Sequence, residues 1–119
     1  MLAWVYGLDP AGVAITAMNE AEILHGIARL PDGRRKQILQ QSWDGLVADV
    51  FLGSVWPFSS EAAHWCAQLL RSRERLARPM AKADAVIAAT ALAHGAQLAT
   101  RDVADFADVG LGLINPWAA

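Results

Sequence analysis

The chain has 119 residues, of which 55% are hydrophobic and 18% are charged, and its formal net charge is −2. This length suits one domain with a single core, and the high apolar fraction excludes a mainly disordered chain. The one cysteine excludes a disulfide framework and a cysteine-based zinc site, and the slightly negative charge excludes the global basic field of many duplex-binding proteins.

The apolar spacing alternates between short strands and amphipathic helices. Gly95 is expected just past the end of a buried helix, and Trp65 is expected on the inner face of another. The predicted elements are a helix near residues 2–6, a strand at 13–15, a helix from Thr16 or Asn19 to Leu30, a helix at 34–50, a strand at 53–56, a helix from Ser59 or Ser60 to Leu76, a helix at 82–94, and strands at 97–100 and 111–114.

Short apolar strands separated by helices predict an α/β fold with a small parallel sheet covered on both faces. We expect a single domain over residues 1–119. No apolar run approaches the roughly 20 residues of a membrane span. The N-terminus also lacks the basic lead of a secretion signal, so a cytoplasmic protein without a membrane partner is expected.

Acidic residues fall where functional groups gather in a parallel α/β sheet, beyond the carboxyl ends of the strands. Glu22 lies in the helix after the first predicted strand, Asp84 in the first turn of the buried helix, and Asp102 just past the strand at 97–100, with Asp105 one turn further on. Carboxylates that converge in this way suit Mg²⁺ or Mn²⁺, which can activate water and neutralise charge on a phosphate.

Each acid also has an explanation without a metal. Asp84 is favoured in a first turn by the helix dipole alone, Asp102 can simply start a turn, and Glu22 can be a solvated helix residue. Glu22 and His25 have the Glu-x-x-His spacing of carboxylate di-iron bundles, but those bundles need two such pairs and this chain has one.

Two basic runs stand out, and most such runs are solvated helix faces. A functional version would place arginines beside the acids, where they could bind phosphates in a bidentate manner. The runs are Arg34-Arg35-Lys36, and Arg71, Arg73 and Arg75 with Arg78.

Several stretches resemble, in order and at family spacing, the motifs of PIN-domain toxins of the VapC/FitB type. They are Thr16-Ala-Met-Asn-Glu-Ala-Glu22 with the residues up to 36, Val55-Trp-Pro-Phe58, the segment 81–93, Gln97-Leu-Ala-Thr100-Arg101-Asp102-Val-Ala-Asp105-Phe106, and Asn115-Pro116-Trp117. The resemblance covers nearly the whole chain. It implies a PIN-like three-layer α/β/α fold, with the family's first central strand and first acid missing from the sequence.

The resemblance implies an endoribonuclease, a hydrolase that uses Mg²⁺ or Mn²⁺ and acts as the toxin of a type II toxin–antitoxin pair. The implied partners are RNA as substrate, a small DNA-binding antitoxin and a second copy in a homodimer. The predicted site consists of Glu22, Asp84 and Asp102 as catalytic and metal-binding residues, Asp105 as a further metal ligand, and Thr16, Thr100 and Arg101 as supporting residues.

Three functions stay open at this point. The first is an active RNA-cutting toxin. The second is a catalytically weak or silent module that binds an antitoxin or a sister chain, and the third is a scaffold whose carboxylates are ordinary surface residues. A divalent cation should raise the melting temperature only where a preorganised acidic site exists.

Overall fold

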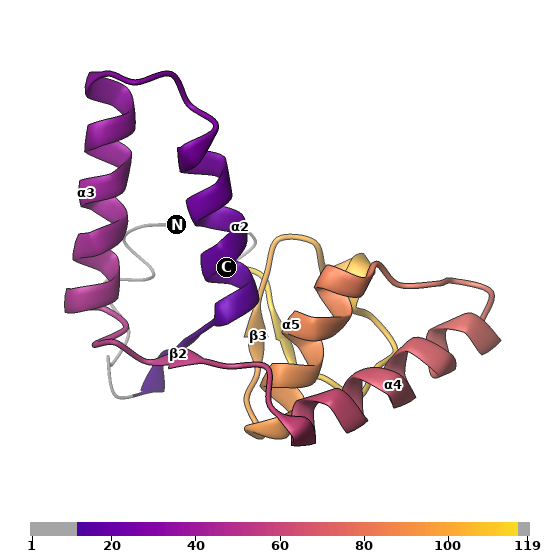
Figure 1. The fold of residues 1–119 in the computed structure, drawn as a ribbon. Helices are drawn as coiled ribbons and strands as arrows, with labels where there is room; N and C mark the ends of the chain where they lie inside the picture. Colours follow the sequence, from indigo (N-terminus) through magenta and orange to yellow (C-terminus); the bar gives the residue numbers. More distant parts are fainter. Residues whose placement is uncertain (1–11, 117–119) are drawn as a thin grey trace. The chain divides into compact units, whose positions relative to one another are not determined.

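The computed structural model describes residues 12–116, and the chain divides into two compact units at the bond between Trp56 and Pro57. Among the described residues, each unit contains one parallel pair of short strands and two α-helices (Figure 1). The parallel pairing and the α/β class are as the sequence predicts.

The first unit is built on a helical hairpin. Its elements are β1 (Ile15–Thr16), α2 (Ala17–Ala28), α3 (Arg34–Asp49) and β2 (Val55–Trp56). Figure 1 shows α2 and α3 side by side, joined by a loop at the top of the view. β1 and β2 pair with Ile15 opposite Val55. Trp43 is buried on α3, and its ring lies 6.3 Å from that of Phe51.

A reciprocal cap fixes the start of α2. The Thr16 hydroxyl oxygen accepts the backbone N–H of Asn19 at 3.1 Å, and the Asn19 side-chain oxygen accepts the Thr16 hydroxyl at 2.7 Å and its backbone N–H at 3.4 Å. This capping box satisfies a first-turn N–H that has no partner inside the helix. The structure therefore selects Thr16 over Asn19 as the residue before the helix.

The second unit is centred on a helix that is buried on most sides. Its elements are α4 (Ser60–Arg75), α5 (Lys82–Ala93), β3 (Leu98–Ala99), η2 (Val103–Phe106, a 3₁₀ helix) and β4 (Leu113–Ile114). α4 packs along α5, and their small side chains let the two backbones approach closely. The buried residues of the two helices are Ala62, Cys66, Leu69, Arg73, Ala85, Ile87, Ala88, Ala89, Thr90 and Ala91.

Helix ends in the second unit follow the sequence signals. The Ser59 hydroxyl accepts the Ala62 N–H at 3.1 Å and caps α4. Gly95 has a φ of +63° and follows the end of α5, as expected of a residue that must adopt the left-handed conformation.

Two expectations need correction. The strands do not form one sheet within residues 12–116: β1 pairs with β2, and β3 pairs with β4, in two separate two-stranded sheets. Trp65 is 40% exposed rather than inside, because the buried stripe of α4 runs through Ala62, Cys66 and Leu69 and passes beside it. The helix expected near residues 2–6 lies outside the described residues. No helix in the described part of the chain is long and apolar enough to cross a membrane.

Candidate active site: an aspartate cluster in the second unit

Asp84 occupies the third position of α5. The preceding Ala81 offers no side-chain cap, so the first turn of the helix gains its negative charge from Asp84 alone. The residue after it, Ala85, is fully buried. Asp84 is therefore half-buried at the edge of the most enclosed helix in the second unit.

Asp102 precedes the 3₁₀ turn that follows β3, and Asp105 lies within that turn. The Thr100 hydroxyl accepts the backbone N–H of Asp102 at 3.0 Å, which fixes the turn out of the strand. The backbone N–H of Asp105 then donates to the Asp102 carbonyl at 3.1 Å. Phe106, the last residue of η2, is buried. Thr100 thus contacts the backbone of Asp102, and its supporting role in the site stays a prediction.

The charges of Asp105 and Asp102 act on Asp84. Burial raises the pKa of Asp84, and the negative charges of Asp105 and then Asp102 raise it further. None of the ion pairs that join described residues includes any of the three. Three of the four predicted acids therefore lie in the second unit, where the negative charges of two of them reach the third, Asp84.

The fourth acid lies in the first unit. Glu22 is exposed on α2, and the cap at Thr16 sets the start of the helix that carries it. That Glu22 meets the three aspartates stays a prediction. Arg101, the other expected supporting residue, is exposed in the turn after β3.

A metal site requires side chains at suitable distances as well as negative charge. In the part of the chain that the structure describes, no three His, Cys, Asp or Glu side chains stand close enough to enclose a metal ion. The donor chemistry nevertheless fits Mg²⁺, which is commonly held by only one or two carboxylates while water and substrate phosphate fill the other positions.

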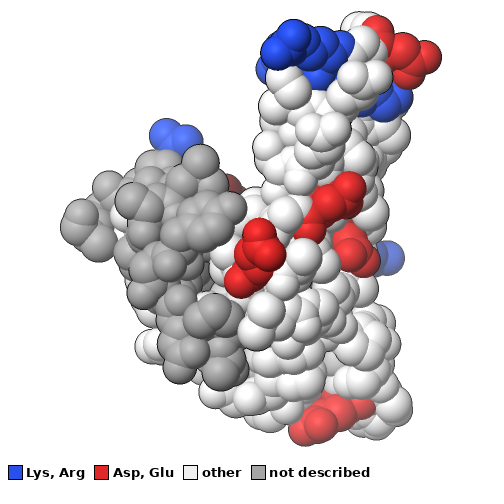
Figure 2. All heavy atoms as spheres, turned by 90° about the vertical axis from the view of Figure 1, so that its left-hand side faces the viewer, with Lys and Arg blue, Asp and Glu red and all other residues white. Residues whose placement is uncertain are grey.

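The basic run Arg34-Arg35-Lys36 lies in the first unit. It forms the first turn of α3 at the tip of the α2–α3 hairpin, where Figure 2 shows Lys and Arg side chains gathered beside an acidic group. Lys36 pairs there with Asp32 at 3.2 Å. Within the first unit, these residues lie on an exposed helix tip rather than beside a buried acid.

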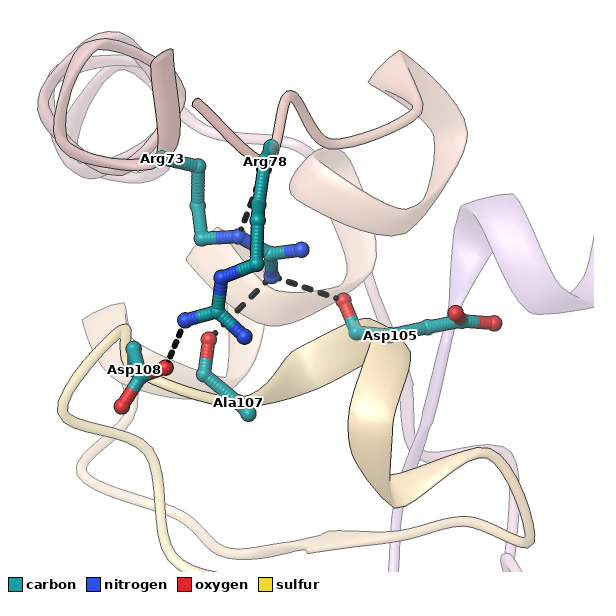
Figure 3. Close-up of polar contacts among 5 residues, drawn as sticks. All are labelled: Arg73, Arg78, Asp105, Ala107 and Asp108. Carbon is teal, nitrogen blue, oxygen red and sulfur yellow. Dashed lines mark hydrogen bonds and ion pairs between the residues drawn. The ribbon is translucent and has the colours of Figure 1, made fainter. Parts of the chain in front are cut away.

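The second basic run contains a residue that sequence reasoning missed. Arg73 is 6% exposed, whereas Arg71 and Arg75 in the same turn are exposed. Its guanidinium donates to the backbone carbonyls of Arg78, Asp105 and Ala107 (Figure 3). The signal that could have found it is its spacing, because Arg73 continues the buried stripe four residues after Leu69.

A model of the PIN domain matches residues 2–111 of the sequence. The chain belongs to the PIN-domain family. Within the family it groups with VapC and FitB toxins. VapC ribonuclease Y4jK of Sinorhizobium fredii (strain NBRC 101917 / NGR234) is 38% identical over 117 residues, which are 98% of this chain and 84% of that protein. Toxin FitB of Neisseria gonorrhoeae (strain ATCC 700825 / FA 1090) is 32% identical over the same shares.

Solved structures agree with this PIN-domain assignment. The structure of FitAB bound to IR36 DNA fragment matches with a TM-score of 0.88 and 32% identity, covering 98% of this chain and 81% of that one. The expected PIN-like fold is confirmed, and so is the resemblance to VapC/FitB toxins.

Proposed function

We propose that this PIN-domain toxin is an endoribonuclease that uses Mg²⁺ or Mn²⁺ to hydrolyse RNA phosphodiesters. The observation that carries the proposal is the interaction of Asp84 with Asp105 and Asp102, whose negative charges raise its pKa. Similarity to a protein named VapC ribonuclease supports RNA as the substrate class.

The residues that would hold the metal are Asp84, Asp102 and Asp105, with Glu22 contributed by α2. A bound divalent ion supplies a water of lowered pKa and neutralises charge on the phosphate under attack. Asp84 is half-buried, and the negative charges of both other aspartates raise its pKa. We assign Glu22, Asp84 and Asp102 as the catalytic residues.

The supporting residues fix where these carboxylates stand. Thr100 holds the backbone of Asp102 through its hydroxyl, and Thr16 caps the helix that carries Glu22. Arg101 lies next to Asp102 in the sequence and is exposed, so we assign it to contacts with the RNA backbone, which an arginine can bind through two parallel hydrogen bonds. We further propose that the two units work together as one PIN domain, because the family match spans both.

The partners we propose are a small DNA-binding antitoxin and a second copy of the chain. Exposed large apolar side chains supply surface that a partner can cover, and likeness to FitAB, solved with a DNA fragment, supports a partner that binds DNA. Light scattering of the chain, alone and after co-expression with the neighbouring gene product, tests both. These exposed side chains are Ile23, Leu24, Ile38, Leu39, Leu52, Phe58, Trp65, Leu76 and Val103.

The activity is tested by incubating the purified chain with RNA in the presence of Mn²⁺ or of a chelator. Cleavage is expected with Mn²⁺ and not with the chelator, and Asp84→Asn should abolish it. The matched control is Asp44→Asn, which changes an exposed carboxylate on α3 that accepts a hydrogen bond from Gln40 at 3.0 Å. Equal cleavage by the Asp84→Asn and Asp44→Asn proteins would refute the assignment.

A second candidate function is a catalytically weak or silent module that binds an antitoxin or a sister chain. It is favoured by the lack, within residues 12–116, of three ligand side chains close enough to hold a metal. This candidate predicts tight association with the co-expressed partner and no cleavage at any Mn²⁺ concentration. Cleavage that depends on both Mn²⁺ and Asp84 would reject it.

A further inference from the structure

We propose that Arg73 is a positioning residue for the aspartate cluster: its guanidinium holds the backbone of η2 and so fixes Asp102 and Asp105 beside Asp84. The inference rests on the proposed function of the cluster, and it adds a residue outside the acidic motifs.

Arg73 is unusually buried for an arginine. A guanidinium stays charged at any ordinary pH, and burying a charge is costly unless hydrogen bonds compensate for it. No ion pair between described residues includes Arg73. Its compensation comes from backbone oxygens instead: Nε donates to the Arg78 carbonyl at 2.8 Å, and Nη1 donates to the carbonyls of Asp105 at 3.0 Å and Ala107 at 3.1 Å.

Two of the carbonyl oxygens that Arg73 binds lie at the end of η2. The last carbonyls of a helix have no N–H partner within it, and they form its partly negative end. η2 ends at Phe106, so the carbonyls of Asp105 and Ala107 lie at that end. Arg73 therefore caps η2 from a helix that lies 32 to 34 residues earlier in the sequence.

The backbone and the side chain of Asp105 point in different directions. Figure 3 shows the Asp105 carbonyl facing Arg73 while its carboxylate points away from the guanidinium. Because the Asp105 N–H is also bonded to the Asp102 carbonyl, holding one end of the turn restrains the other. The exposed ion pair between Arg78 and Asp108 adds a weaker tie to the same segment.

Lysine is the substitution that separates geometry from charge. A lysine side chain keeps the positive charge but has a single nitrogen. Arg73 donates through two nitrogens, Nε and Nη1, which the planar guanidinium holds at a fixed separation. Arg73→Lys should therefore loosen η2 without removing the positive charge of the side chain. Arg75→Lys makes the same change at an exposed position of the same turn, and Leu69→Ala lowers stability at a buried position of α4 that makes none of these hydrogen bonds.

The experiment measures Mn²⁺ affinity by calorimetry without RNA, together with amide hydrogen exchange of Asp105 and Ala107 by NMR. Arg73→Lys is expected to weaken Mn²⁺ binding about tenfold, the usual scale for residues that orient metal ligands, and to speed exchange of both amides. Arg75→Lys and Leu69→Ala are expected to keep the wild-type Mn²⁺ affinity.

Unchanged Mn²⁺ affinity in a folded Arg73→Lys protein would overturn the proposal, as would an equal loss in Leu69→Ala.

If the unmodified chain binds no Mn²⁺, the proposed function fails, and the rate of amide hydrogen exchange alone decides the positioning role. Faster exchange in Arg73→Lys but not in Arg75→Lys then supports it, and equal exchange overturns it. If Arg73→Lys does not fold, Phe106→Leu decides: retained Mn²⁺ affinity supports Arg73 as the anchor, and a tenfold loss assigns that role to Phe106.

Discussion

Replacing Asp84 by asparagine is expected to stabilise the folded chain at neutral pH while it removes the proposed activity. Burial, and then the charges of Asp105 and Asp102, raise the pKa of Asp84 above its ordinary value of 3.8. The folded state therefore binds more protons than the unfolded state between the two pKa values. The free energy of unfolding falls as pH rises through that window, and the loss is complete above the raised pKa. Asparagine carries no charge, so the variant escapes this loss.

The size of the gain follows from the exposure of the cluster. Asp84 is half-buried, and Asp102 and Asp105 are exposed, so solvent screens their repulsion. Charge pairs of this kind are worth about 0.2 to 1 kcal/mol. For a chain of this length, a gain within that range raises the melting temperature by roughly 1 to 5 °C. Below pH 3.8 the carboxyl is protonated in both states, and the difference between the two proteins should vanish.

Thermal unfolding with and without Mn²⁺ tests both halves of this reasoning. At a Mn²⁺ concentration ten times its dissociation constant, the unmodified chain should gain about 1.4 kcal/mol, and the Asp84→Asn protein should gain little. Asp44→Asn, on the exposed side of α3, should behave as the unmodified chain does. A lower melting temperature for Asp84→Asn at pH 7, or an equal Mn²⁺ shift in both proteins, would refute the electrostatic account.

Other predictions concern helix ends and can be checked by chemical denaturation. Thr16→Ala removes the cap of α2 and should cost about 1 kcal/mol, whereas Thr16→Ser should cost less than half of that; equal losses would contradict the capping role. Arg34→Glu and Arg35→Glu place acids in the first turn of α3, which has none, and each should add about 0.3 to 1 kcal/mol, shrinking at high salt. Gly95→Ala forces a left-handed φ of +63° on alanine with no steric contact and should lower the free energy of unfolding by about 1 kcal/mol. Gly26→Ala within α2 should raise it by a similar amount. Changes of the same sign in both variants would be inconsistent with a conformational cause.

Local chemistry carried the sequence predictions that the structure confirms. The helix boundaries at Thr16, Ser59 and Gly95 depend on a hydroxyl, or on a residue without a Cβ, at a position that each helix end requires. The burial of α5 follows from its composition, because it has apolar residues on most faces. Asp84 and Asp102 could be placed as candidates because Asp84 lies in the first turn of a helix and Asp102 follows the end of a strand.

Long-range contacts account for what the sequence did not predict. Arg73 was one cation in a basic run, and its partners at Asp105 and Ala107 lie more than thirty residues away. Trp65 was expected inside because of its spacing along the helix, but the buried face of α4 runs through smaller residues such as Ala62. A periodic pattern predicts an apolar face of a helix, but the neighbouring helix determines which residues of that face are buried.

Asp105 shows why a buried arginine can stand next to an acidic cluster without cancelling its charge. If the guanidinium of Arg73 paired with the Asp105 carboxylate, it would neutralise a group that a divalent cation needs. It binds the carbonyl of the same residue instead, and the carboxylate points the other way. The backbone of Asp105 thus supplies the structural contact while its side chain keeps its negative charge. On this reasoning, an acidic residue introduced beside Arg73 would compete for the guanidinium, loosen η2 and lower Mn²⁺ affinity, even though it adds negative charge near the site.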